Sequence, residues 1–326
     1  MDRIRIVGGR PLNGAIPISG AKNATLPLMI AGLLTDQTLI LDNVPRLADV
    51  GLLQRILGNH GVDIMVGGKR PGETADTGQT LHISAANIVD TTAPYELVSK
   101  MRASFWVLAP LVARMGEARV SMPGGCAIGT RPVDLLIMAI ERLGAKVDID
   151  GGYVVAHAPR GLRGGEIVFP KVTVGGTHTA LMAAALANGT TVIENAAQEP
   201  EIADVAECLN KMGARIAGAG TPRIVIEGVA KLNGARHAVL PDRIETGTYA
   251  IAAAMAGGDI LLQNARPELL QAALDVITQA GATVTATNEG IRVARNGVGI
   301  APVDVTTAPF PEFPTDLQAQ LMALMT

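Results

Sequence analysis

Three segments of this chain are apolar on nearly every side. They are LPLMIAGLL after Thr25, TALMAAALA from Thr179 and TYAIAAAMA from Thr248. A helix without a polar face has to be enclosed by other elements, so each segment predicts a buried helix.

A second kind of segment is amphipathic. In PEIADVAECLNKM, from Pro200, one stripe is apolar and the other is charged. The apolar stripe comprises Ile202, Val205, Cys208 and Leu209, and the charged stripe comprises Asp204, Glu207 and Lys211. This spacing predicts a helix that lies between a sheet and solvent.

Both kinds of helix belong to one repeated layout. Each copy has an apolar helix, a turn, a β-branched strand with Asn after it, a proline-started helix, then glycine and another strand. Return strands such as YVVAHAP from Tyr153 and RIVIEGV from Arg223 complete the copies. The repeat predicts an α/β fold in which small sheets surround buried helices.

The copy that begins at Arg114 follows the same scheme but contains an insertion. Its turn at Gly116 lies farther from its helix-opening Pro132 than the corresponding residues do in the other copies. The extra residues run from Met122 to Thr130, and Cys126 lies at their centre in PGGCAIGTRP. Because a repeated framework is scaffold, we expect chemistry at the insertion.

Composition narrows the classes of protein. With 326 residues, 48% of them hydrophobic, the chain can bury a large core, and its length suggests two domains. A net charge of -3 gives no reason to expect a nucleic-acid or membrane partner. The start, MDRIRIVGG, alternates like a strand and lacks a signal peptide's apolar core. We therefore expect a cytoplasmic protein.

Polar residues gather where the apolar helices start. If equivalent helices run side by side, their N-termini point into a common space, where backbone N–H groups and positive helix ends favour anions. Three cations would add full charges, so we predict a cleft for phosphate or carboxylate groups. The residues concerned are Lys22, Asn23, Arg102, Lys171, Thr173 and Asp316.

Plainer interpretations stand beside this one. A single lysine such as Lys22 at a helix start is usually a solvated surface residue, and Arg102 one turn before Trp106 is also typical of a stacked cation and ring. The chain has neither a P-loop nor a convincing GxGxxG motif. Its histidines lack metal-ligand spacing and are expected on the surface or in the core; they are His60, His82, His157, His178 and His237.

The two cysteines have different settings. Cys208 belongs to an apolar stripe, where it behaves as a small hydrophobic residue. Cys126 lies shortly before a predicted helix N-terminus and near Arg131, and both features lower the pKa of a thiol. Such a thiol can donate a proton or attack an electrophile, although a loop cysteine without a role is the alternative.

Several long motifs, taken together, resemble the UDP-N-acetylglucosamine enolpyruvyl transferase family. They are, in order, SGAKNATLPLM, MRASFWVLAPL, MPGGCAIGTRPVDLL, KVTVGGTHT, GTTVIENAAQEPEI, LPDRIETGTY and FPTDLQAQ. The resemblance implies an inside-out α/β barrel of two domains, built from repeated units with helices in the core. It places a complete three-unit domain at residues 22–239 and an incomplete one at residues 1–21 plus 240–326.

The resemblance also implies a reaction. The enolpyruvyl group of phosphoenolpyruvate moves to the 3'-hydroxyl of UDP-N-acetylglucosamine, and phosphate leaves, without a metal or organic cofactor. This is the first committed step of peptidoglycan synthesis.

Roles for individual residues come from the same resemblance. Cys126 would be the proton donor and the residue alkylated by fosfomycin, Lys22 and Asn23 would contact phosphoenolpyruvate, and Asp316 would be the general base. Other implied substrate contacts are Arg102, Arg131, Pro132, Val133, Asp134, Leu135, Lys171, Thr173 and Val174.

Two rival functions accompany this one. The first is a catalytically silent sugar-nucleotide-binding protein with a regulatory role. The second is 3-phosphoshikimate enolpyruvyl transfer, but the cysteine segment followed by RPVDLL is typical of the sugar-nucleotide branch. A fifth apolar helix starts at PTDLQAQLMALMT, and we expect the chain to be a truncated form of a longer protein whose further arginines would grip phosphoenolpyruvate.

The first prediction concerns Cys126. Phosphate release should require both phosphoenolpyruvate and UDP-N-acetylglucosamine, and Cys126→Ala should abolish it because the proton donor is lost. Cys126→Asp should retain activity, since a carboxyl group can also carry the proton. Normal turnover by Cys126→Ala, measured as released phosphate, would remove this cysteine from the mechanism.

Overall fold

A computed structural model describes residues 3–67, 78–123, 132–297 and 299–326. The chain divides into two compact units, called here unit 1 (Met1–Ser19 and Pro241–Thr326) and unit 2 (Gly20–Leu240). The chain passes between the units twice, at residues 19–20 and 240–241; the resemblance implied passages at residues 21–22 and 239–240. Among the described helices, none is long and apolar enough to cross a membrane.

The described residues of unit 2 form three four-stranded sheets that share one topology. In each sheet a parallel edge strand pairs with a first strand, which pairs with an antiparallel return strand, which pairs with a last strand. In that order the sheets are β13 (Ala235–Ala238), β2 (Thr38–Val44), β4 (Gln79–Ser84), β3 (Asp63–Gly67); β5 (Thr92–Ala93), β6 (Glu117–Ser121), β8 (Tyr153–His157), β7 (Lys146–Asp150); and β9 (Glu166–Val168), β10 (Thr190–Glu194), β12 (Arg223–Glu227), β11 (Arg215–Ala217). The repeat and its return strands are thereby confirmed.

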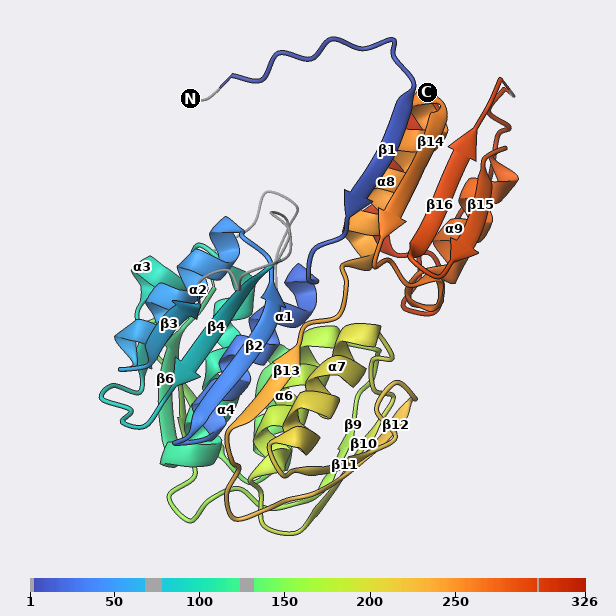
Figure 1. Ribbon diagram of the computed structural model, residues 1–326. Coiled ribbons are helices and arrows are strands. Elements are labelled where there is room, and N and C mark those ends of the chain that lie inside the picture. Colours follow the sequence, from blue (N-terminus) through green and yellow to red (C-terminus); the bar gives the residue numbers. More distant parts are fainter. Residues whose placement is uncertain (1–2, 68–77, 124–131, 298) are drawn as a thin grey trace. The chain divides into compact units, whose positions relative to one another are not determined.

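Helices fill the interior of unit 2 (Figure 1). The interior helices are α1 (Lys22–Ala31), which continues as η1 (Gly32–Leu34), then η2 (Arg102–Val107) with α4 (Leu108–Met115), and α6 (Val174–Ala185). The outer ones are α2 (Ala48–Asn59), α3 (Tyr95–Val98), α5 (Asp134–Arg142) and α7 (Pro200–Lys211). Residues 24–31 and 176–185 are buried throughout, as predicted for helices without a polar face. Unit 2 is an inside-out α/β barrel.

The expectation that a proline starts each outer helix is only partly right. α7 does begin at Pro200, but α2 begins at Ala48 and α5 at Asp134. The residues just before these two helices, Leu47 (φ -124°, ψ 152°) and Val133 (φ -110°, ψ 7°), lie outside helical geometry. The chain therefore turns into the helix later than the prolines suggest.

The asparagine at the end of the first strand has the same backbone conformation in three repeats: Asn43 is the last residue but one of β2, and Asn195 and Asn264 directly follow β10 and β14. The φ angle is 58° at Asn43, 58° at Asn195 and 64° at Asn264, in the left-handed region that asparagine tolerates better than most residues. In unit 2 the side chain also bridges two strands: Nδ2 of Asn43 donates to Val239 O at 3.0 Å, and Nδ2 of Asn195 donates to Phe169 O at 2.9 Å. Each carbonyl lies directly after a parallel edge strand, so the asparagine ties the two strand ends together.

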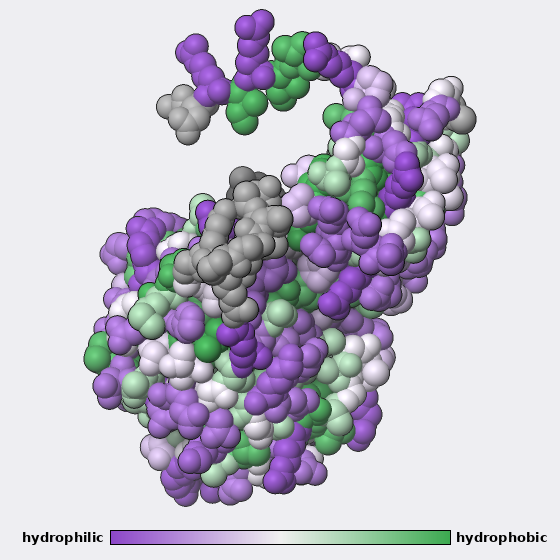
Figure 2. All heavy atoms as spheres, viewed as in Figure 1, coloured by the Kyte–Doolittle hydropathy of each residue, from purple (hydrophilic) through white to green (hydrophobic). Residues whose placement is uncertain are grey.

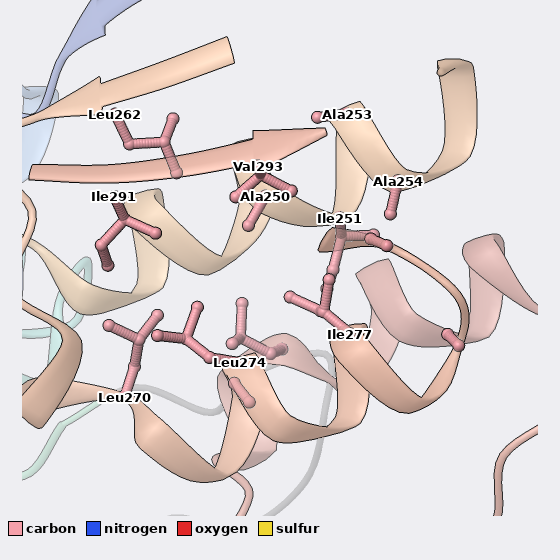
Figure 3. Packing of buried hydrophobic residues seen from close by; sticks show 14 of the residues in the cluster. Ala250, Ile251, Ala253, Ala254, Leu262, Leu270, Leu274, Ile277, Ile291 and Val293 are labelled. Atoms are coloured by element: carbon pink, nitrogen blue, oxygen red, sulfur yellow. The ribbon is translucent and has the colours of Figure 1, made fainter. Parts of the chain in front are cut away.

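Unit 1 has one sheet among its described residues, in the order β1 (Leu12–Pro17), β14 (Gly258–Gln263), β16 (Gly290–Arg295), β15 (Thr283–Thr287). Its helices are α8 (Arg243–Ala256), η3 (Pro267–Leu269), α9 (Gln271–Gln279), η4 (Thr315–Leu317) and α10 (Gln318–Leu324). Figure 3 shows the core, where Leu262, Ile291 and Val293 of the sheet face side chains of α8 and α9.

The prediction that the apolar helix from Thr248 is fully enclosed is wrong. In α8, Ala250 and Ile251 are buried, but Met255 is 40% exposed. Three sheets surround the interior helices of unit 2, whereas one sheet and neighbouring helices cover α8 in the described part of unit 1.

The two edge strands β1 and β13 are exchanged between the units. β1 precedes α1 in the chain but pairs with β14, and β13 precedes α8 but pairs with β2. In the other two sheets the edge strand lies in the same unit as the interior helix that follows it: β9 directly precedes α6, and β5 precedes η2 with the short α3 between them. This exchange accounts for both passages of the chain between the units.

The expected strand at the start of the chain is not formed. Among described residues β1 begins at Leu12, and the preceding segment leaves Ile4, Ile6 and Val7 largely exposed (Figure 2). Alternation alone does not make a strand, because a strand is stabilised by pairing, and no described strand pairs with residues 3–11.

The repeated asparagine yields a stability prediction. Asn195→Ala should lower the free energy of unfolding by about 1–3 kcal/mol, because alanine resists a positive φ and the bond to Phe169 is lost. Asn195→Gly should cost less, since glycine adopts this φ freely. Urea unfolding of both variants measures the difference; equal losses would show that backbone strain is not the cause.

Candidate functional site

A cavity of about 440 Å³ lies in unit 2 where interior helices begin. Its described lining comes from the starts of α1, η2 and α6 and from the first turn of α2. The lining residues are Lys22, Asn23, Leu26, Asp49, Met101, Arg102, Ala103, Trp106, Thr173, Val174 and Gly175. The structure thus brings together Lys22, Asn23, Arg102, Thr173 and Val174, which the sequence had singled out in three separate repeats.

The helix starts at this cavity are built differently. At α6, Oγ1 of Thr173 accepts a hydrogen bond from the Gly176 N–H at 3.2 Å, and the Thr173 carbonyl accepts one from Oγ1 of Thr177 at 2.8 Å. At α1 no side chain caps the helix, and the Ala21 N–H is held by the Leu240 carbonyl at 2.8 Å. The positive ends of both helices therefore add to the charges of Lys22 and Arg102, and the cavity favours anions.

One lining residue carries the opposite charge. Asp49 Oδ2 lies 3.7 Å from Lys22 Nζ, with 43% and 46% of the two side chains exposed. The sequence did not reveal this pair, because an acidic residue in the first turn of a helix is common without any other role. Arg102 is held from another direction, since Nη2 donates to the Pro132 carbonyl at 3.4 Å.

Trp106, the one tryptophan of the chain, forms part of the cavity wall. Its ring lies 5.2 Å from the ring of His178, at an interplanar angle of 47°. A Cβ atom at Gly175 would lie 3.1 Å from Trp106 Nε1, so glycine allows the start of α6 to approach the indole. Sequence spacing did not reveal the contact between Trp106 and His178.

His178 is fully buried behind this wall. Burial lowers its pKa to about 3, and neither ring nitrogen has a hydrogen-bond partner among the described residues. The imidazole is therefore neutral at physiological pH. His60 is also buried, and burial lowers its pKa as well. The prediction that these two are core histidines is confirmed.

The other described residues that the sequence selected are not part of the cavity lining. Pro132 and Val133 precede α5, Asp134 and Leu135 open it, and Lys171 is an exposed residue before α6. Asp316 is exposed in η4 of unit 1. Cys126 and Arg131 lie outside the described residues.

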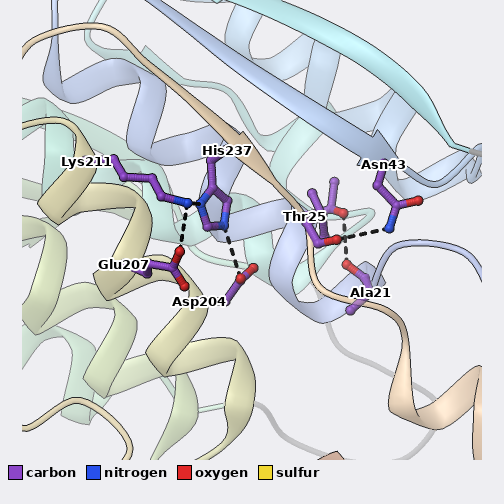
Figure 4. A network of polar contacts seen from close by, with 8 residues as sticks. Ala21, Thr25, Asn43, Asp204, Glu207, Lys211 and His237 are labelled. Carbon is purple, nitrogen blue, oxygen red and sulfur yellow. Dashed lines mark hydrogen bonds and ion pairs between the residues drawn. The ribbon is translucent and has the colours of Figure 1, made fainter. Parts of the chain in front are cut away.

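A second polar network corrects the prediction that the charged stripe of α7 faces solvent. Asp204 was expected on a solvated stripe, but it is buried and Oδ1 accepts from His237 Nε2 at 3.1 Å (Figure 4). Lys211 Nζ donates to the other ring nitrogen of His237 at 3.1 Å and pairs with Glu207 at 2.7 Å. These contacts join α7 to β13. Asp204 does not need solvent as a partner, because His237 of β13 forms a hydrogen bond with its carboxylate.

Cys208 matches its expected role. It is buried on the apolar side of α7, and burial raises the pKa of its thiol to about 12. This thiol is therefore protonated and does not act as a nucleophile at physiological pH.

An inside-out α/β barrel of repeated units with an anion-attracting cavity at its helix starts defines a class, the enolpyruvyl transferases. The sequence profile of EPSP synthase (3-phosphoshikimate 1-carboxyvinyltransferase) matches residues 6–326. The chain belongs to this family.

Proteins of similar sequence support this family, and solved structures share the fold. Proteins called UDP-N-acetylglucosamine 1-carboxyvinyltransferase from Rhodopseudomonas palustris (strain TIE-1) and Afipia carboxidovorans are 79% and 80% identical, over 100% of this chain and 76% of each relative. The enolpyruvyl transferase NikO from Streptomyces tendae superposes with a TM-score of 0.79 at 22% identity, over 97% of this chain and 73% of that chain. EPSP synthase from Acinetobacter baumannii gives 0.65 at 20% identity, over 89% and 65%. The last two similarities concern the fold.

Buried His178 yields a prediction for acid stability. Since its pKa is about 3 in the folded protein and near 6.5 when exposed, the unfolded chain takes up a proton that the folded chain does not. Above pH 6.5 the imidazole is neutral in both states and adds no pH dependence, whereas protonation of the unfolded chain lowers the free energy of unfolding as pH falls from 6.5 toward 3. His178→Phe should therefore reduce the loss of unfolding free energy between pH 7 and pH 5 by about 2 kcal/mol.

Urea unfolding at both pH values checks this expectation. Met182→Leu, another buried substitution on α6, is the matched control for repacking, because it removes no titratable group. An unchanged pH dependence in His178→Phe would show that His178 is not the group responsible.

Proposed function

We propose that this protein transfers the enolpyruvyl group of phosphoenolpyruvate to the 3'-hydroxyl of UDP-N-acetylglucosamine and releases phosphate. The observation that carries this proposal is the cavity, where Lys22, Asn23, Arg102 and Thr173 meet from three repeats at positive helix ends. The name shared by relatives that are 79–80% identical supports the choice of sugar nucleotide.

The cavity suits phosphoenolpyruvate, which carries a phosphate and a carboxylate. Lys22 and Arg102 supply charges for these two anionic groups, and the N-termini of α1 and α6 add backbone dipoles. Asn23 offers an amide donor beside them. We assign further substrate contacts to Arg131, Lys171 and the segment 132–135 on the basis of the family resemblance.

The proposed chemistry is an addition followed by an elimination. The sugar hydroxyl oxygen bonds to the central carbon of phosphoenolpyruvate while Cys126 delivers a proton to the methylene carbon, and Asp316 accepts the hydroxyl proton. The methyl group of the tetrahedral intermediate then returns a proton to the Cys126 thiolate, and the carbon–carbon double bond reforms. Phosphate leaves with the electrons of its C–O bond and takes up the proton held by Asp316. Every atom and charge is accounted for without a cofactor.

Its place in the cell follows from the substrates. UDP-N-acetylglucosamine is the precursor of peptidoglycan, so we assign the protein to the first committed step of cell-wall synthesis in the cytoplasm. Alkylation of Cys126 by fosfomycin belongs to the same proposal.

The test is phosphate release with each acceptor. We expect release with UDP-N-acetylglucosamine plus phosphoenolpyruvate, and none when either is omitted. Release with 3-phosphoshikimate as acceptor would favour the activity after which the family profile is described. Binding of UDP-N-acetylglucosamine without release would favour the silent binding protein.

The cavity cations yield a matched prediction. Lys22→Gln and Arg102→Gln should each lower kcat/KM for phosphoenolpyruvate about 10- to 100-fold, because each removes a charge-assisted contact with the substrate. Lys146→Gln is the control, since Lys146 is 79% exposed on β7 and pairs with Asp148. Steady-state kinetics of all three variants provide the test. Values of kcat/KM for the two cavity variants equal to that of the control would contradict the assigned roles.

A further inference from the structure

The lining of the cavity contains a group that works against an anion. Asp49, in the first turn of α2, lies 3.7 Å from the ammonium of Lys22. A carboxylate this close occupies the lysine, so an anion that reaches Lys22 has to displace or share this partner.

The strength of this competition depends on how exposed the ion pair between Asp49 and Lys22 is. The two side chains are 46% and 43% exposed, and an ion pair in that setting is screened by water. Asp49 therefore cannot prevent anion binding next to Lys22, Arg102 and two helix ends. It can only weaken that binding by a modest factor.

A modest weakening has a use at this position. If the proposed function holds, on which this inference rests, phosphate is both a part of one substrate and the released product. A cavity with uncompensated Lys22 would retain free phosphate, whereas phosphoenolpyruvate has a second anionic group with which to reach Arg102.

We propose that Asp49 is a specificity-determining residue that competes with bound anions for Lys22 and so weakens the hold of the cavity on inorganic phosphate. It acts through the lysine and not through the general field of the protein. Asp49 lies in α2 and Lys22 at the start of α1, so only the tertiary fold brings the two side chains together.

Trp106 makes this measurable. It is the one tryptophan of the chain and it lines the same cavity, so its fluorescence reports on the occupied site, and titration calorimetry provides an independent signal. The probe is inorganic phosphate at low ionic strength, where screening is weakest. Asp49→Asn should tighten the Kd for phosphate about two- to fivefold, and Asp49→Glu, which keeps the charge, should stay near the wild type.

A double variant separates the pair from the field. In the Lys22→Gln background, Asp49→Asn should leave the Kd for phosphate unchanged, because the residue for which Asp49 competes is gone. The same two- to fivefold gain in that background would overturn the competition for Lys22. Glu96→Gln, which removes an exposed first-turn carboxylate of α3 in the same unit, is the control for net charge.

Remaining outcomes are also decisive. If Asp49→Asn lowers thermal stability and leaves the Kd at the wild-type value, Asp49 only stabilises α2, and the inference fails alone. If neither phosphate nor phosphoenolpyruvate binds to the wild type or to Asp49→Asn by either measurement, the anion site itself is absent and the proposed function fails with it.

Discussion

The close packing of interior helices inside unit 2 is the constraint on which the site depends. Helices without a polar face must be covered on every side, and small residues let them approach their neighbours. At Gly176, for example, a Cβ atom would lie 2.5 Å from Thr173 Cγ2 and 2.9 Å from the ring of Phe169. With so little freedom, the helices hold their N-termini where the cavity forms, and the cavity inherits its preference for anions.

This preference is balanced within the site. Lys22 and Arg102 enter from two repeats and Asp49 from the outer helix of the first, so the described lining of the cavity combines two cations with one anion. Behind the wall, neutral His178 packs against Trp106 and adds no charge, because burial keeps its pKa low. The electrostatic character of the cavity thus comes from half-exposed groups and helix ends, and the buried histidine supplies shape.

The exchange of β1 and β13 shows how repetition can produce two units from one chain. Each edge strand completes a sheet in the unit opposite to that of the helix it precedes. The hydrogen bond from Asn43 to the Val239 carbonyl lies next to the second passage of the chain between the units. It therefore holds the end of the exchanged strand β13 against β2.

Local features of the fold were predictable from the sequence because they depend on neighbours in the chain. The segments without a polar face identified α1 and α6, the return strands became β8 and β12, and the asparagines at the ends of the first strands adopt one backbone conformation. The start of α2 was misplaced, because the helix begins at Ala48, three residues after Pro45, the proline that was expected to open it.

Candidate residues at the helix starts could also be chosen from the sequence, since repetition implies that equivalent helices begin at equivalent places. What the chain alone could not reveal were the partners from other elements: Asp49 beside Lys22, His178 against Trp106, and His237 buried with Asp204. The sequence determined which helices are enclosed and which residues stand at their ends. Tertiary packing decided which charges meet, because distances between side chains of separate helices and strands are set only after the sheets have closed around the helices.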